Sequence, residues 1–312
     1  MKKFVKALAL SCAVVPLAQA ALFLGNPAFA AEAAAPVAAA PVTEAKPALW
    51  AVKDADTTIY LFGTIHVLKP GLGWFDEAVK DAFDKSDELV LELVLPENPA
   101  EVAQKMMPLA IDQTGTPLSS LLSDEERAAY AAMLAKFGVA PQQFDMFKPW
   151  FVGVTLTTMP LPQLGYNPEE GVEKKLTAFA KSAGKPVSGL ETVEEQLGYF
   201  DNLPQADQLS FLNGVVRDLD KMGPMLDTLV TQWSAGDPEG LAETMNESMK
   251  ESPKLTEILL WNRNHRWAEQ IEEKLEQPGT FFVAVGAGHL AGEKSVQDYL
   301  AERGLTAERI DY

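Results

Sequence analysis

The chain has 312 residues, of which 47% are hydrophobic, and its formal net charge is −18. This length and apolar content allow one large core or two small ones and exclude an acidic disordered chain. The negative charge argues against a nucleic-acid partner because it would repel phosphate, and a single cysteine, Cys12, excludes a disulfide-stabilised scaffold.

Residues 1–30 have the features of an export signal. The basic segment Met1–Lys6 precedes a nearly continuous apolar stretch over residues 7–24, and Ala28-Phe29-Ala30 has the small-x-small pattern that signal peptidase recognises. The apolar stretch also reaches the lower length limit of a membrane anchor, but a proline and a glutamine interrupt it and favour cleavage after Ala30. We therefore expect a periplasmic or secreted protein without a stable membrane span after cleavage.

Residues 31–47 are rich in alanine and proline and lack a periodic apolar face, which predicts a disordered linker before a single folded domain over residues 48–312. Because residues 1–30 contain three lysines and no acidic residue, the rest of the chain carries a net charge of −21. The chain after residue 30 has no cysteine, which suits an oxidising compartment and excludes thiolate chemistry and cysteine-ligated zinc.

The predicted elements place strands near both ends of the domain. Turn residues 54–56 indicate a β-hairpin, Ser123 with Glu126 forms a capping-box signal, and Gly138 and Gly184 are expected to end helices. In chain order we predict strands 49–52 and 57–62, helix 74–86, strand 88–95, helices 123–138 and 168–184, strand 185–190, helices 192–202, 205–221, 224–235, 238–250 and 253–276, strand 280–285, helix 295–303 and strand 306–310. This order predicts a mixed α/β fold, with a helical insert between the strand-rich ends.

Two of the three histidines lie in the same local context. Each of the segments Gly63–His66 and Gly286–His289 follows an apolar strand and has the pattern G-x-x-H. Ligands bind at the carboxyl ends of strands in α/β sheets, and glycine allows a sharp turn there. One such histidine would be read as an ordinary loop residue, whereas two in matching positions favour a shared site.

Two glutamates are candidates for the same site. Glu92 lies in an apolar strand, where a carboxylate is costly unless it is paired or bound to a cation, although strand alternation could instead direct it outward at a sheet edge. Glu191 ends the next predicted strand, where it could also be a first-turn acid favoured by a helix dipole. Together, His66, Glu92 and His289 would form a nitrogen and oxygen donor set suited to Zn²⁺, Mn²⁺ or Co²⁺ with an open position for water.

Arg263 is the remaining candidate, and it lies in the predicted helix 253–276. Trp267 follows four residues later on the same face. Arg263 could bind a carboxylate or stabilise an oxyanion, or it could stack on Trp267. The third histidine, His265, points elsewhere on this helix and is expected to face solvent.

In combination, these motifs resemble the TraB/GumN (Tiki-like) family. The resemblance covers nearly all of residues 48–312 in the expected order and most closely indicates the exported GumN-like bacterial branch. It is carried by residues 60–66 (YLFGTIH), 89–93 (LVLEL), 185–192 (KPVSGLET), 195–197 (EQL), 233–237 (WSAGD), 263–267 (RNHRW) and 285–292 (VGAGHLAG).

The resemblance implies a central β-sheet built from two related halves, each of which contributes one G-x-x-H histidine. The fold is then similar in outline to those of erythromycin esterases and haem-binding ChaN-like proteins. Animal Tiki members are metal-dependent proteases, which implies that His66 and His289 are metal ligands and that Glu92 is the matching acid. Glu191 and Arg263 lie in further family motifs and would support the site or contact the substrate.

We therefore predict an exported, divalent-metal-dependent hydrolase that cuts peptide bonds. The metal would be Mn, Co or Zn, with Glu92 as the third ligand or as the base that activates water, and Arg263 and Glu191 would assist catalysis. The substrate would be a peptide or a small molecule. Two alternatives are a non-catalytic protein that binds a peptide, haem or glycan, and a metal-free esterase that uses His66 as its base.

Overall fold

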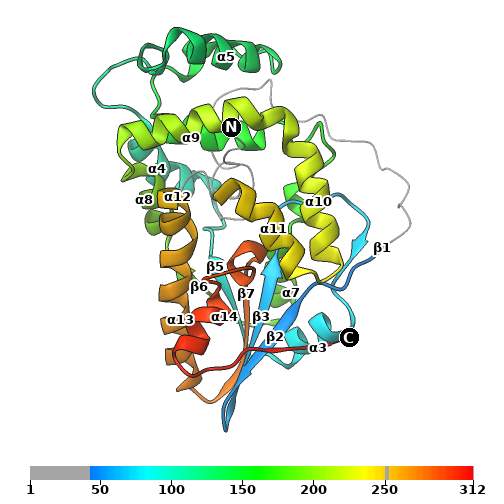
Figure 1. Ribbon diagram of the computed structural model, residues 1–312. Coiled ribbons are helices and arrows are strands. Elements are labelled where there is room, and N and C mark those ends of the chain that lie inside the picture. Colours follow the sequence, from blue (N-terminus) through cyan, green and yellow to red (C-terminus); the bar gives the residue numbers. More distant parts are fainter. Residues whose placement is uncertain (1–42, 250–252, 312) are drawn as a thin grey trace.

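The computed structural model describes residues 43–249 and 253–311, and its centre is a six-stranded mixed sheet (Figure 1). The strand order is β6-β5-β7-β3-β2-β8, in which β6, β5, β7 and β3 run parallel and β2 is antiparallel to both of its neighbours. The strands are β2 (Leu49–Lys53), β3 (Thr57–Thr64), β5 (Glu88–Leu93), β6 (Val187–Glu191), β7 (Gly279–Gly286) and β8 (Glu308–Arg309). The sheet confirms the predicted mixed α/β class and the hairpin of β2 and β3.

The sheet order places the two G-x-x-H motifs next to each other. Strands β3 and β7 are parallel neighbours, and their register pairs Gly63 with Val285 and Thr64 with Gly286. The two strands therefore end at the same edge of the sheet and at the same level, so both motifs begin there. Strand β5 pairs with the other side of β7, so Glu92 reaches this edge as well.

Helices cover both faces of the sheet, and further helices lie beyond the carboxyl ends of the strands (Figure 1). Helices α13 and α14 pack on one face, and α3, α7, α10 and α11 contribute to the core on the other. None of the helices in the described ranges has the length and apolar character needed to cross a membrane. The helices are α3 (Glu77–Lys85), α4 (Pro99–Ala110), α5 (Asp124–Ala135), α6 (Pro149–Thr158), α7 (Val172–Ala183), α8 (Val193–Asp201), α9 (Gln205–Asp218), α10 (Met222–Ser234), α11 (Pro238–Met249), α12 (Pro253–Thr256), α13 (Asn262–Leu275) and α14 (Val296–Glu302).

Local signals set several helix ends as expected. Ser123 and Glu126 form a complete capping box at the start of α5, and Gly184 ends α7 with φ of 67°, a left-handed conformation that glycine adopts without steric cost. The predicted helix 253–276 is interrupted, because a π-helical turn over Glu257–Trp261 separates α12 from α13. Helix α6 is buried on all sides, so its sequence has no polar face and no helical periodicity to detect.

The predicted linker ends earlier than expected. Thr43–Glu44 forms strand β1, which pairs in parallel with β4 (Leu72–Gly73), and the amide of Lys46 donates to the carbonyl of Ser234 at 2.8 Å. The prediction of a disordered linker is therefore wrong for residues 43–47. Their pairing depends on strand β4, which lies 29 residues later in the chain, and not on local periodicity. The predicted signal segment and the rest of the linker lie outside the described residues.

Candidate active site

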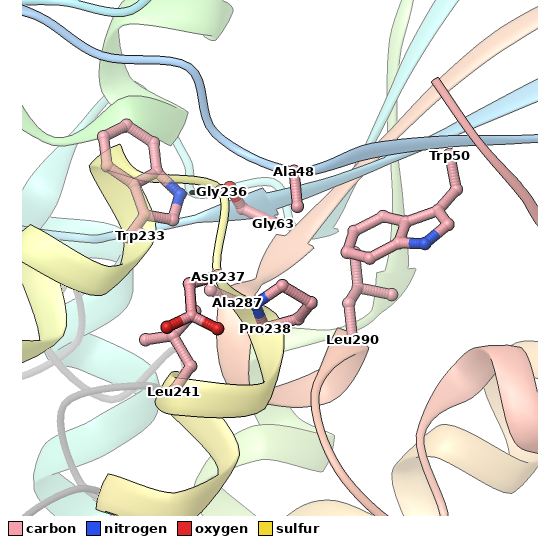
Figure 2. Close-up of a pocket in the computed structure, with 10 residues that line it drawn as sticks. All are labelled: Ala48, Trp50, Gly63, Trp233, Gly236, Asp237, Pro238, Leu241, Ala287 and Leu290. Atoms are coloured by element: carbon pink, nitrogen blue, oxygen red, sulfur yellow. Dashed lines mark hydrogen bonds between the residues drawn. The ribbon is translucent and has the colours of Figure 1, made fainter. Parts of the chain in front are cut away.

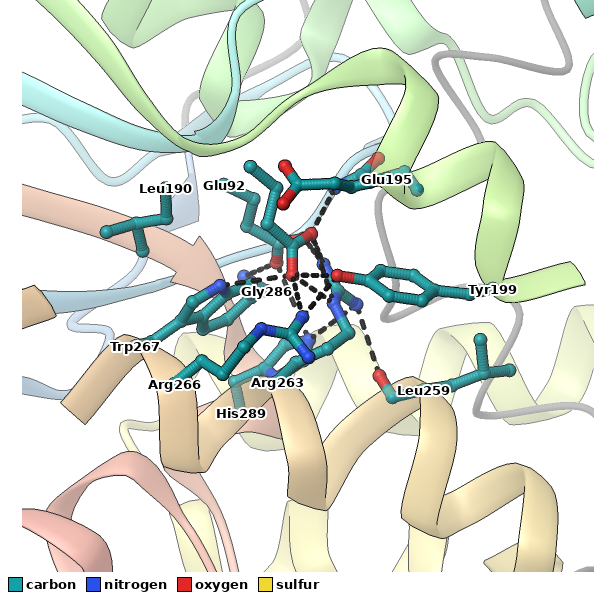
Figure 3. A network of polar contacts seen from close by, with 12 residues as sticks. Glu92, Leu190, Glu195, Tyr199, Leu259, Arg263, Arg266, Trp267, Gly286 and His289 are labelled. Carbon is teal, nitrogen blue, oxygen red and sulfur yellow. Dashed lines mark hydrogen bonds and ion pairs between the residues drawn. The ribbon is translucent and has the colours of Figure 1, made fainter. Parts of the chain in front are cut away.

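The five predicted site residues meet at the carboxyl edge of the parallel strands, and most of them are labelled in Figure 3. Glu191 ends β6, Glu92 lies in β5, His66 follows β3, and His289 lies in the 3₁₀ turn η7 (Ala287–Leu290) after β7. Arg263 reaches the same point from the first turn of α13. All five are buried, with exposed fractions between 0% and 6%. The sheet order thus converts five separate sequence signals into one cluster.

Glu92 points into the cluster because of strand alternation. It shares a face of β5 with Val90, which packs in the core beneath α13. Strand β5 lies between β6 and β7, so the alternative of an outward-facing glutamate at an edge is wrong. Its carboxylate accepts from Arg263 Nη2 at 2.7 Å and from the amide of Gly286 at 2.6 Å. Burial raises the pKa of Glu92, and the Arg263 charge opposes that rise.

Arg263 uses all five of its N–H groups. Nε donates to Glu191 at 2.9 Å, and Nη2 donates to Glu191 at 2.8 Å as well as to Glu92. Nη1 donates to the carbonyl of Leu259 at 3.1 Å, within the π-helical turn, and lies 3.3 Å from His289 Nε2. The guanidinium also lies 4.6 Å from the ring centroid of Trp267, so the stacking alternative is observed too. In this arrangement Arg263 joins the two glutamates and has no N–H left for a substrate.

Glu191 anchors this arginine. Burial would raise the pKa of Glu191, but the Arg263 charge and donated hydrogen bonds lower it below the usual value, so the carboxylate is ionised at neutral pH. Glu191 lies in strand β6 and not in a first helical turn, which corrects the helix-dipole alternative. Its other donors, which the sequence analysis did not assign to the site, are Gln196 (3.0 Å), Tyr199 (2.9 Å), Trp267 (3.1 Å) and Arg266 (3.3 Å).

His289 is held as a neutral imidazole with a defined tautomer. Its Nδ1 lies 2.5 Å from Oδ1 of Asn264, whose Nδ2 donates to the carbonyl of Lys294 at 2.7 Å. This assignment of the amide places the ring proton on Nδ1, so the Nε2 lone pair faces Arg263. Burial, the Arg263 charge and His66 all hold the pKa of His289 well below its ordinary value.

The low pKa of His289 makes the stability of the metal-free protein depend on pH. Below about pH 6.5 the unfolded chain binds a proton at this histidine that the folded protein does not bind, so stability is lost as the pH falls. We expect the free energy of unfolding of the wild type to fall between pH 6.5 and 5 more steeply than that of His289→Gln, by up to about 1.4 kcal/mol per pH unit. Urea denaturation across this range measures the slopes. Equal slopes for His289→Gln and the wild type would contradict the assignment.

His66 contacts an acidic residue that the sequence analysis did not identify. Its Nδ1 lies 2.6 Å from Oε1 of Glu173, a short contact that is not a linear hydrogen bond, and the hydroxyl of Thr64 donates to the same oxygen. Burial lowers the pKa of His66, but the Glu173 charge outweighs it and gives a net rise. Burial raises the pKa of Glu173, and His66 and Thr64 reverse this to a net decrease. Nε2 of His66 is buried and has no hydrogen-bond partner among the described residues.

The glycine that begins the first motif allows the second motif to approach it. A Cβ at Gly63 would lie 3.1 Å from Cα of Ala287, and Trp233 Nε1 donates to the carbonyl of Gly63 at 2.8 Å. Figure 2 shows the cavity that remains where Asp237 and Pro238, at the start of α11, meet both motifs. Its volume of about 10 Å³ is at the limit for a single water molecule, so it is a packing space and not a substrate pocket.

The predicted metal ligands do not fit a bound ion in their present arrangement. Nε2 of His289 and Oε1 of Glu92 lie 3.7 Å apart, but the Arg263 guanidinium contacts both side chains. A positive group in this position repels a divalent cation. Across residues 43–249 and 253–311, no three His, Cys, Asp or Glu side chains are grouped as a metal site. Among the three predicted ligands, His66 offers the buried Nε2, which has no hydrogen-bond partner within the described residues.

Comparison with known proteins identifies relatives over nearly the whole domain. The uncharacterized protein YbaP of Escherichia coli is 24% identical over 254 residues, which cover 81% of this chain and 92% of YbaP. The metalloprotease TIKI2 of Danio rerio is 24% identical over a gapped alignment of 315 positions, which covers 83% of this chain and 60% of TIKI2. No solved structure gives a significant match.

The sequence profile of the TraB/PrgY/gumN family matches residues 48–309, which include all five predicted site residues and Glu173. The match therefore extends from strand β2 to strand β8, so it covers every strand of the central sheet. The chain belongs to the TraB/PrgY/gumN family.

Proposed function

We propose that this protein is a hydrolase that cuts peptide bonds, with its reacting groups at the carboxyl edge of β3, β5 and β7. The observation that carries the proposal is the state of His66, whose buried Nε2 lacks a hydrogen-bond partner among the described residues while Nδ1 faces Glu173. An imidazole that faces a carboxylate on one side and has a free lone pair on the other can accept a proton from water. The name of the TIKI2 relative, a metalloprotease, supports peptide hydrolysis as the reaction.

In this proposal the surrounding charges support proton transfer at His66. Nε2 of His66 takes a proton from the water whose oxygen bonds to the substrate carbonyl carbon, and Glu173 stabilises the imidazolium that results. The imidazolium then gives this proton to the leaving amine as the carbon–nitrogen bond breaks, which returns His66 to its neutral form. The Arg263 guanidinium supplies a fixed positive charge near the developing oxyanion, and Glu191 and Glu92 hold it in place. Neutral His289 keeps its lone pair directed at Arg263, so it adds no competing positive charge.

Binding of a divalent metal is a separate proposal, because Arg263 contacts both of the predicted ligands His289 and Glu92. The TIKI2 relative's name supports a metal, and His66, His289 and Glu92 are the donors that the sequence assigns to it. Binding would require Arg263 to move away from Glu92 and His289. No step of the proton transfer described above depends on the ion.

We also propose that the protein is exported, with cleavage after Ala30, and that its substrate is a periplasmic or extracellular peptide. The basic, apolar and small-residue segments of residues 1–30 support this proposal. Intact-mass measurement of the protein recovered from cells tests it, since cleavage leaves a chain that begins at Ala31. A full-length chain that still begins at Met1 would contradict export by this route.

The test of the proposed function combines metal content with peptide cleavage. Protein without a histidine tag is analysed by mass spectrometry for bound Mn, Co and Zn, and a peptide library is digested with and without each ion. We expect cleavage by the wild type and none by the His66→Ala/His289→Ala double variant. Near-stoichiometric metal that the double variant loses would support the metal proposal, and cleavage that persists in EDTA would contradict it. Cleavage of esters but not of peptides would favour the esterase alternative.

A further inference from the structure

Glu173 contacts the ring nitrogen of His66 that lies opposite the proposed proton acceptor, Nε2. Oε1 of Glu173 lies 2.6 Å from Nδ1 of His66 and also accepts from the Thr64 hydroxyl, two residues before His66. A carboxylate at this distance from Nδ1 favours a proton on that nitrogen, because two facing lone pairs would repel. The proton on Nδ1 leaves the lone pair on Nε2, the atom that has no hydrogen-bond partner among the described residues.

The backbone around Glu173 is fitted to the His66 turn. Glu173 lies in the first turn of α7, and the amide of Val172 donates to the carbonyl of Ile65 at 3.0 Å. A Cβ on Gly171 would lie 2.2 Å from the carbonyl oxygen of His66. At this distance the carbon and oxygen atoms would overlap, so only glycine fits unless the backbone moves. Gly171 has φ of −56°, so its requirement is for space and not for an unusual backbone angle. The start of α7 is therefore docked directly on the turn that carries His66.

We infer that Glu173 is a positioning residue. The docking of Gly171 and Val172 on the His66 turn holds Glu173 in place, and Glu173 fixes His66 as the Nδ1–H tautomer with its lone pair on Nε2. For its use in catalysis the inference rests on the proposed function. The predicted tautomer of His66 is independent of the proposed function, because it is a property of the protein without substrate. The same orientation would serve a base or a metal ligand, since both require an Nε2 lone pair.

The tautomer can be observed directly by NMR. The chain has three histidines, so long-range proton–nitrogen correlations of ¹⁵N-labelled, metal-free protein at alkaline pH contain few imidazole signals, and loss of one set in His66→Gln assigns His66. We expect the Nδ1–H pattern for His66 in the wild type. Glu173→Met, which keeps side-chain length and removes the carboxylate, should shift His66 toward the Nε2–H form.

Two further variants make the test selective. Gly171→Ala keeps Glu173 but adds a Cβ that would collide with the His66 carbonyl, so it should also give a mixture of the two tautomers. If Glu173→Met does not fold, the result for Gly171→Ala alone tests whether the docking of α7 fixes the tautomer. Glu169→Met removes a mostly exposed acid that pairs with Lys174, and it should leave the His66 signals unchanged. An unaltered Nδ1–H pattern in both Glu173→Met and Gly171→Ala would overturn the inference.

Kinetics then separate this inference from the proposed function. If the wild type cleaves peptides, Glu173→Met should lower kcat by about 10- to 100-fold with little change in KM, as observed for groups that orient a reacting histidine. A changed tautomer in a protein without any hydrolytic activity would reject the proposed function and leave the positioning of His66 intact. Full activity in Glu173→Met despite a changed tautomer would reject the catalytic use of the contact.

Discussion

Replacing Arg263 by leucine is expected to lower the free energy of unfolding at neutral pH by about 3–5 kcal/mol. The guanidinium is 1% exposed and binds two buried carboxylates, so its removal leaves two negative groups in the core without their main counter-charge. The pair itself contributes less to stability than this loss suggests, because the desolvation of the charges offsets much of their attraction. Urea denaturation of the metal-free protein gives the difference between wild type and variant.

Three variants test whether the loss comes from the unpaired carboxylates. Arg266→Leu removes a half-exposed arginine that contacts the same Glu191 at 3.3 Å, and it should cost less than about 1 kcal/mol. Arg263→Leu combined with Glu92→Gln and Glu191→Gln should recover much of the lost stability, because the buried charges are then absent. If Arg263→Leu alone is as mild as Arg266→Leu, the assigned role of Arg263 is wrong.

The second large effect is expected on catalysis. If His66 is the proton acceptor, His66→Gln should lower kcat for peptide cleavage by about 10²- to 10⁴-fold and change KM little. Glutamine has a similar size and cannot take up a proton, so the variant removes the chemistry while it keeps most of the packing. The matched control is His265→Gln, because His265 lies on α13 with its side chain about half exposed, as the sequence analysis predicted.

The pH dependence of the reaction gives an independent check on His66. A base must be unprotonated, so the rate should rise as the pH increases through the pKa of His66. Because the Glu173 charge raises that pKa above the ordinary value for histidine, about 6.5, this limb of the profile is expected above pH 6.5 in the metal-free reaction. Removing the carboxylate in Glu173→Met should move the limb to lower pH. A rate that does not change between pH 5 and 8 would contradict His66 as the base.

The sequence was sufficient to single out most residues of the buried polar cluster one by one. His66 and His289 are marked by the repeated strand and G-x-x-H pattern, and Glu92 by its place in an apolar run. These signals are local, since each depends on a few neighbouring residues and on the chemistry of a charge or a ring among apolar side chains. The cost of burying a carboxylate correctly indicated that Glu92 has a partner, and the structure shows that the partner is Arg263.

The structure alone decided what each residue contacts. Nothing in the spacing of Arg263 shows that all five of its N–H groups are used. Glu173 has no local pattern that distinguishes it from the acids just before it, Glu169 and Glu170. Glu173 reaches His66 because α7 docks on the turn after β3, more than a hundred residues earlier in the chain. Contacts of this kind depend on side-chain packing between elements, which periodicity does not encode.

By itself, then, the sequence determined the mixed α/β class, the hairpin, several helix ends and five members of the buried polar cluster, because backbone propensity, capping and the cost of buried charge act over short distances. Only the tertiary structure decided that β7 lies between β5 and β3, that residues 43–47 join the fold, and that Glu173 faces His66. The physical reason is that strand order and helix docking depend on hydrogen bonds and apolar contacts between segments that can lie more than two hundred residues apart. Those interactions form only when the whole chain is folded.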